Sequence, residues 1–164
     1  IYAFKEFQIL KGKKETIPSK YNILKMTATI AEGLIITVVF GYLGFISKGG
    51  LPALLRNSNL FFHLLIPIVS IINFIFFEKT DKIIFKDTLY GILPTAIYEI
   101  YYVINVLLNS KNGKIPPEYD WYYFLQNGTW TAIIIVPIML FITYIITLII
   151  WQLNKTDLKK KHTD

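Results

Sequence analysis

The sequence contains no cysteine, only two histidines and a single arginine, and charged residues make up just 17% of its 164 residues. The lack of cysteine excludes disulfide bonds, thiolate metal ligands and cysteine nucleophiles. Soluble domains carry about 25% charged residues, and the charges here are bunched, so that long stretches have almost none. These shortages exclude a disordered chain, an ordinary water-soluble domain and a typical nucleic-acid-binding domain. No cofactor is expected, and no metal site either, because one histidine in an apolar segment does not form a ligand cluster.

The sequence is rich in long apolar segments. Hydrophobic residues make up 54% of the chain and aromatic residues 16%, and the mean hydropathy is +0.47. Four segments are long enough to cross a hydrocarbon core of about 30 Å as helices, which pair their backbone polar groups internally as lipid requires. We therefore predict an all-α polytopic membrane helix bundle that forms one transmembrane domain over residues 1–164, with spans at about 26–46, 60–77, 88–108 and 130–151.

The first residues predict a further span upstream. Residues 1–10 are largely apolar and lead into Gly12, which is flanked by lysines at positions 11, 13 and 14. Glycine after the last turn and cations within it are typical of a helix C-terminus. The first residue is Ile1 rather than methionine. Four spans are visible, and we expect six in the complete protein.

The distribution of the cations predicts the orientation. Thirteen lysines precede the first span, join the second span to the third or follow the fourth, whereas the other two connections hold four cations. Cytoplasmic segments of membrane proteins carry an excess of lysine and arginine. Both ends of the chain are therefore predicted to be cytoplasmic. This pattern explains the net charge of +6 without nucleic acid, and it makes membrane lipids the expected partners.

A few polar residues lie inside the predicted spans, where they are functional candidates because ionisable groups are costly in hydrocarbon. His63 should lie about 5 Å inside the outer boundary, and Glu99 about 9 Å deeper, near the midplane. This separation prevents direct contact without helix tilt but allows both side chains to line a shared cavity. Tyr102 and Asn105 follow Glu99 along the same helix, so they are further candidates for the wall of a substrate pocket.

Each of these residues also has a purely structural interpretation. His63 lies close enough to an interface to bind water or lipid headgroups. A protonated Glu99 would donate a hydrogen bond between helices, and Glu32 in the first span is interpreted as structural in the same way. Asn105 would join neighbouring helices, as asparagine commonly does in membranes.

Two shorter patterns concern packing and the end of the bundle. Gly33, Gly41 and Gly44 belong to a stripe of small residues on the first span, which predicts a face for close helix contact. Between the third and fourth spans, two prolines at 116–117 break any helix, and residues 119–124 are almost wholly aromatic. This connection is expected to lie in the outer interface or to fold back over the mouth of the bundle.

The second span and its surroundings carry a family resemblance. The run Asn59-Leu60-Phe61-Phe62-His63-Leu64-Leu65-Ile66-Pro67, with Glu78 after the span, resembles the androgen-induced gene-one and androgen-dependent TFPI-regulating protein family and its six-span bacterial relatives. The later features occur in the order of that family: a tyrosine-rich helix over 89–106, then Pro116-Pro117 and Tyr119-Asp120 before the last span. The resemblance covers roughly residues 26–152.

The resemblance implies an intramembrane hydrolase of the threonine type that cleaves fatty-acid ester lipids in a bacterial plasma membrane. His63 takes the role of the catalytic histidine, and Glu99, Tyr102 and Asn105 are expected to bind the substrate. The threonine nucleophile of the family lies in an earlier span and is expected upstream of this chain. The sequence departs from the family at Leu64, where a threonine commonly stands beside the histidine.

Two other classes of function stay open at this point. A lipid-binding or scaffolding membrane protein without catalysis would have the same composition and the same spans. A transporter of small solutes or ions would depend on Glu99, although the lack of recognisable internal repeats argues against it.

Overall fold

The computed structural model describes residues 18–78, 80, 82–110, 115–125 and 127–160, together with Phe7 and Lys11, and it describes side chains as far as Lys155. Within these residues every regular element is a helix and no strand occurs. The predicted all-α fold class is therefore confirmed. The expected end of an upstream span at 1–10 lies outside the described residues except for Phe7.

The helices follow one another in four groups. Their bounds are α2 (Ser19–Val38), η1 (Val39–Leu43), α3 (Gly44–Ile46) and α4 (Gly50–Leu54); η2 (Phe61–Leu65), α5 (Ile66–Ile72) and η3 (Asn73–Phe77); η4 (Phe85–Ile92) and α6 (Leu93–Asn109); and η5 (Thr129–Thr131) with α7 (Ala132–Lys160).

Two of the changes in helix geometry occur at prolines. Wide π-type turns over Phe61–Leu65 end just before Pro67, which has no N–H to donate to the carbonyl of His63 four residues earlier. The tight 3₁₀ turns of η4 give way to the α-helix α6 at Pro94. The backbone N–H of Ile84 donates to the Asp87 carboxylate at 2.9 Å, which fixes the start of η4.

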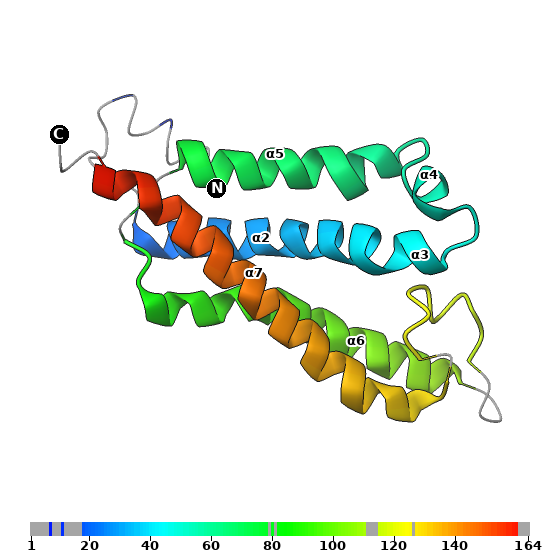
Figure 1. The fold of residues 1–164 in the computed structure, drawn as a ribbon. Coiled ribbons are helices and arrows are strands. Elements are labelled where there is room, and N and C mark those ends of the chain that lie inside the picture. The colour runs from blue at the N-terminus through cyan, green and yellow to red at the C-terminus, as the bar shows by residue number, and fades with distance from the viewer. Residues whose placement is uncertain are drawn as a thin grey trace.

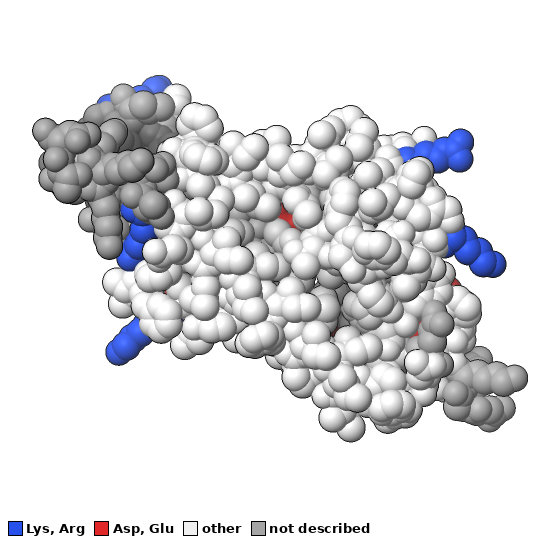
Figure 2. All heavy atoms as spheres, in the orientation of Figure 1, with Lys and Arg blue, Asp and Glu red and all other residues white. Residues whose placement is uncertain are grey.

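Three of the helical stretches are long and apolar enough to cross a membrane, namely Ser19–Ile46, Phe85–Asn109 and Thr129–Lys155, and the apolar helix Phe61–Phe77 is shorter. Many large hydrophobic side chains on them point outward; Phe45, for example, is 82% exposed. On the face drawn in Figure 2, lysine and arginine gather at the two ends and the middle is almost free of charge. The chain is a helical membrane bundle.

Helical stretches that follow one another in the chain run in alternating directions, and α2 lies at the centre (Figure 1). α2 packs against α5, α7 and η4, and α6 packs against α7. In Figure 1, α5 and α6 lie on opposite sides of α2, and α7 crosses in front of the bundle at an angle. This arrangement leaves α5 and α6 apart, with α2 between them.

Two apolar clusters hold the two ends of the bundle together. One consists of the buried side chains Met26, Ile30, Phe74, Ile83 and Ile150, and the other of Tyr102, Val106 and Leu125. The first cluster lies at the end where α2 begins and η3 ends. The second lies at the opposite end, where the loop at 115–125 joins α6 to α7.

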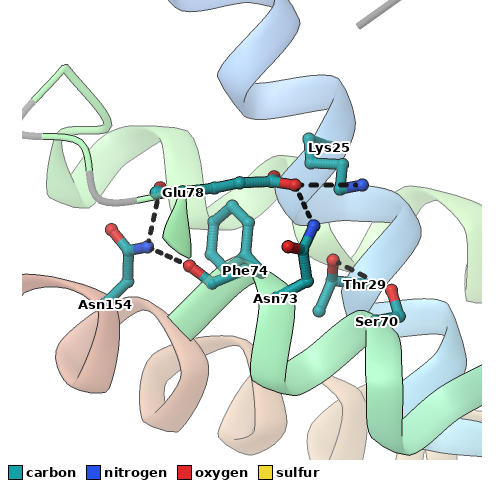
Figure 3. A network of polar contacts seen from close by, with 7 residues as sticks. All are labelled: Lys25, Thr29, Ser70, Asn73, Phe74, Glu78 and Asn154. Atoms are coloured by element: carbon teal, nitrogen blue, oxygen red, sulfur yellow. Dashed lines mark hydrogen bonds and ion pairs between the residues drawn. The ribbon is translucent and has the colours of Figure 1, made fainter. Parts of the chain in front are cut away.

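A polar network closes the end of the bundle that contains the first cluster (Figure 3). The side-chain amide of Asn154 donates to the carbonyl oxygens of Phe74 at 2.6 Å and Glu78 at 3.1 Å. The Glu78 carboxylate lies 3.3 Å from Lys25 Nζ and accepts a hydrogen bond from Asn73. The network joins α2, η3 and α7, and it pairs carbonyls that the end of η3 would leave without partners.

Candidate functional site

A partly open cavity of about 680 Å³ lies between α2, η2, α5, α6 and α7. Its wall is mainly aliphatic and aromatic, and its volume is within the range of about 300 to 1,000 Å³ that small-molecule pockets occupy. On one face of the molecule an acidic side chain is visible in a recess of the otherwise uncharged middle (Figure 2). The polar side chains that line the cavity are Glu32, His63, Thr95, Tyr98, Glu99, Tyr102 and Tyr122.

His63 is oriented by the end of α4. Its Nδ1 lies 2.9 Å from the carbonyl oxygen of Leu54, the last residue of that short helix. Because a carbonyl oxygen only accepts, Nδ1 must carry the proton of this hydrogen bond. In the neutral ring, Nε2 then keeps its lone pair. The C-terminal end of α4 therefore lies against the ring of His63, and the half-buried imidazole keeps one nitrogen that can accept a proton.

Glu99 is the most deeply buried carboxyl of the cavity wall. Its side chain on α6 is 8% exposed, and Oε2 has no hydrogen-bond partner among the residues that the structure describes. Thr95, one turn earlier, lies with its hydroxyl 3.2 Å from that of Thr143 on α7. Glu32 reaches the same cavity from α2 and is half-buried. The cavity thus brings together two carboxyls and one imidazole from three different helices.

Tyr102 connects the cavity to the loop that covers one end of the bundle. Its hydroxyl donates a hydrogen bond to the carboxylate of Asp120, which is 2% exposed and also accepts from the backbone N–H of Leu125 at 3.1 Å. The rings of Tyr42 and Phe124 pack with centroids 5.1 Å apart. The aromatic loop therefore folds back over the mouth of the bundle, which is one of its two predicted positions.

Replacing Tyr102 with phenylalanine is expected to loosen this loop. A hydrogen bond to a carboxylate contributes about 1.5 to 3 kcal/mol, so the substitution should favour local opening by about tenfold to a hundredfold. The measurement is hydrogen exchange at the backbone amide of Leu125, which should become faster by that factor, whereas amides within α2 should keep their rates. An unchanged rate at Leu125 would show that Asp120 holds the loop without Tyr102.

Three of the four site residues predicted from the sequence meet at this cavity. His63, Glu99 and Tyr102 line it, whereas Asn105 is not among its lining residues. Asn105 accepts hydrogen bonds from Asn109 on the same helix instead, through its backbone oxygen at 2.8 Å and its side-chain oxygen at 3.3 Å. Six residues correspond to about 600° of helix rotation, so Asn105 lies about 120° around α6 from Glu99.

Sequence reasoning assigned Glu32 to a structural role and did not single out Thr95 as a wall residue. The signal for Glu32 was present, because it is the one charged residue within the predicted span 26–46. The signal for Thr95 is its spacing, since it stands one helical turn before Glu99. Both residues line the cavity.

The chain matches no known family profile, no curated protein and no solved structure. Among the described residues, no three histidine or acidic side chains are grouped so that they could hold a metal ion. The cavity wall is mainly apolar, and the imidazole, carboxyls and hydroxyls on it are suited to hydrogen bonding and proton transfer.

Proposed function

We propose that this chain is an intramembrane hydrolase of lipid esters in which His63 is the general base. The observation that carries the proposal is the hydrogen bond from His63 Nδ1 to the Leu54 carbonyl, 2.9 Å long. It leaves Nε2 as a proton acceptor on the wall of a largely apolar cavity. The resemblance around His63 and Pro67 supports the same role.

The chemistry begins when Nε2 of His63 takes the proton of an attacking hydroxyl group. The hydroxyl oxygen bonds to the carbonyl carbon of the ester, and the carbonyl π electrons move to its oxygen. When that tetrahedral species collapses, the carbon–oxygen bond to the alcohol breaks, and the leaving oxygen receives the proton from Nε2. The Leu54 carbonyl accepts the Nδ1–H throughout and stabilises the imidazolium that exists between the two proton transfers.

The attacking hydroxyl belongs to a water molecule, which releases the acid directly, or to a threonine, whose acyl ester is then cleaved by a water molecule through the same two proton transfers at Nε2. The resemblance implies a threonine in an earlier span. Thr95 is the threonine that lines the cavity among the described residues, and its hydroxyl is already paired with that of Thr143. We therefore expect the substitution of Thr95 by valine to leave the covalent labelling of the nucleophile in place.

The test uses the full-length protein purified in detergent. Replacing His63 with alanine is expected to lower the hydrolysis of long-chain esters by about 10² to 10⁴-fold, the range for a general base. It should also abolish labelling of a threonine by a fluorophosphonate probe, while the temperature of unfolding stays within a few degrees of wild type. Turnover that survives in a folded His63→Ala protein would overturn the proposal.

A lipid-binding protein without catalysis is the second candidate. It is favoured by the fact that, within the described part of the chain, no hydroxyl group is hydrogen-bonded to Nε2 of His63, the nitrogen that would activate a nucleophile. This candidate predicts that the cavity binds esters without releasing free acid. Binding and turnover measured on the same preparation separate the two functions.

A further inference from the structure

We infer that the cavity binds an uncharged single-chain lipid of the monoacylglycerol type, and that Glu99 on the cavity wall binds the hydroxyl head group of this lipid. This inference rests on the proposed function, because it names the class of ester that the hydrolase would accept. It concerns binding, however, and it is tested below without hydrolysis.

The first step is the unmatched carboxyl oxygen of Glu99. The side chain is more than nine-tenths buried on the cavity wall, and Oε2 has no hydrogen-bond partner among the described residues. Buried polar atoms in folded proteins are nearly always paired, so each exception calls for a specific partner. A ligand in the cavity that carries a hydrogen-bonding group would supply that partner.

The second step is the charge of the wall. The residues that line the cavity include Glu32 and Glu99 but no lysine or arginine. A carboxylate or phosphate head group would place a negative charge beside these carboxyls without a lysine or arginine to pair it, which is unfavourable at low dielectric constant. Free fatty acids and phospholipids are therefore poor ligands.

The third step distinguishes a hydroxyl from an ammonium group. A hydroxyl both donates and accepts hydrogen bonds, so it can pair with the Glu99 carboxyl whether that group is ionised or protonated. An ammonium group only donates, so it would leave the O–H of a protonated Glu99 without an acceptor, and it pairs fully with the ionised form alone. The half-buried Glu32 and the hydroxyls on the wall add further partners for a head group with more than one hydroxyl.

The fourth step is size. A cavity of about 680 Å³ with a predominantly apolar wall has room for a drug-sized ligand, which suits one acyl chain with a small head better than a phospholipid with two chains. Tyr122 and Phe124 of the folded loop line one end of it. The acyl chain would lie along aliphatic wall residues such as Val38, Ile66 and Val136.

The probe for the experiment is a long-chain monoalkylglycerol ether, which has the proposed head group but no ester to cleave. Its binding to the full-length protein is measured by native mass spectrometry in detergent, beside an alkylammonium and a fatty acid of equal chain length. The wild type is expected to prefer the ether. Glu99→Gln should keep ether binding within about threefold, because an amide also donates and accepts.

The decisive variant is Glu99→Leu, which removes both oxygens. Loss of a buried hydrogen-bond partner should weaken ether binding by about tenfold or more. Asn109→Leu is the matched control on the same helix, and its binding should equal that of the wild type, since Asn109 does not line the cavity. If Glu99→Leu does not fold, Glu99→Met replaces it with a flexible apolar side chain of similar length.

Three results would overturn the inference: equal ether binding by wild type and the apolar variant, fatty-acid binding as tight as ether binding, or an alkylammonium preferred by the wild type and lost in Glu99→Gln. The proposed function fails separately. Ether binding together with ester turnover that does not depend on His63 would retain the binding site and reject the hydrolase mechanism.

Discussion

Replacing Gly91 with alanine is expected to destabilise the bundle by about 3 kcal/mol, because the added methyl group has no room. A Cβ at this position would overlap Thr147 Oγ1 and would lie 2.7 Å from both Thr147 Cγ2 and Ile30 Cδ1. Gly91 is buried where η4 meets α2 and α7. The methyl group would therefore act as a wedge between three helices.

The side chain of Thr147 cannot move away easily. It is fully buried, and its hydroxyl donates to the carbonyl oxygen of Thr143 at 2.8 Å. A β-branched side chain in a helix has few χ1 rotamers to choose from. The end of Ile30 is more flexible, but two of the three contacts involve Thr147. The substitution must therefore shift α7 itself.

The measurement is unfolding in mixed micelles of a mild detergent and a denaturing one. Gly41→Ala is the matched control, because a Cβ at Gly41 meets no atom of a neighbouring described segment within 4 Å, and alanine is better than glycine in a helix by about 0.5 to 1 kcal/mol. Adding Thr147→Ala to Gly91→Ala should recover most of the lost stability. Equal stability of the two single glycine variants would contradict this packing.

The glycines show where a sequence pattern predicts packing and where it does not. The stripe on the first span predicted close contact at Gly33, Gly41 and Gly44, and a Cβ at Gly33 would indeed lie 3.0 Å from Ile146. Gly41 belongs to the same stripe but has open space, whereas the tightest contact among the described glycines occurs at the isolated Gly91. Where two helices come closest depends on the angle between their axes. That angle cannot be deduced from the periodicity of residues along one helix.

The helical spans were predictable because apolar length is a direct requirement of a lipid environment. The helix ends were less predictable. The helix of the first predicted span begins at Ser19 rather than near residue 26, and the helix of the fourth predicted span continues to Lys160 rather than ending near residue 151. Hydropathy measures the apolar length, whereas a helix ends where its backbone hydrogen bonds end.

The candidate site was predictable in part for the same reason. Depth along antiparallel helices placed His63 and Glu99 within reach of one cavity, and both line it. The contacts that orient the site join spans to connecting segments: the His63 ring to the carbonyl of Leu54, and Tyr102 to Asp120. Loop conformations set these contacts, and no periodic pattern in the sequence reports a loop conformation.

Asn154 lies at the end of the bundle opposite the aromatic loop. Replacing it with leucine is expected to lower the free energy of unfolding by about 3 kcal/mol or more. Asn154 is 2% exposed, and its side-chain amide contacts three backbone groups. It donates to the carbonyls of Phe74 and Glu78 and lies 3.4 Å from the backbone N–H of Thr80. Leucine would remove the donor from the buried carbonyls of Phe74 and Glu78, at about 1 to 3 kcal/mol each.

The same unfolding assay provides the measurement, and Asn109→Leu provides the control. Asn109 is half-buried, and its amide donates only within α6, to the two oxygens of Asn105, so its loss should cost about 1 kcal/mol or less. Asn154→Asp should be at least as harmful as Asn154→Leu, because a carboxylate cannot donate and would face two carbonyl oxygens. An aspartate variant as stable as the wild type would show that water supplies the hydrogen bonds attributed here to Asn154, and that the network in Figure 3 does not hold α7 to the end of η3.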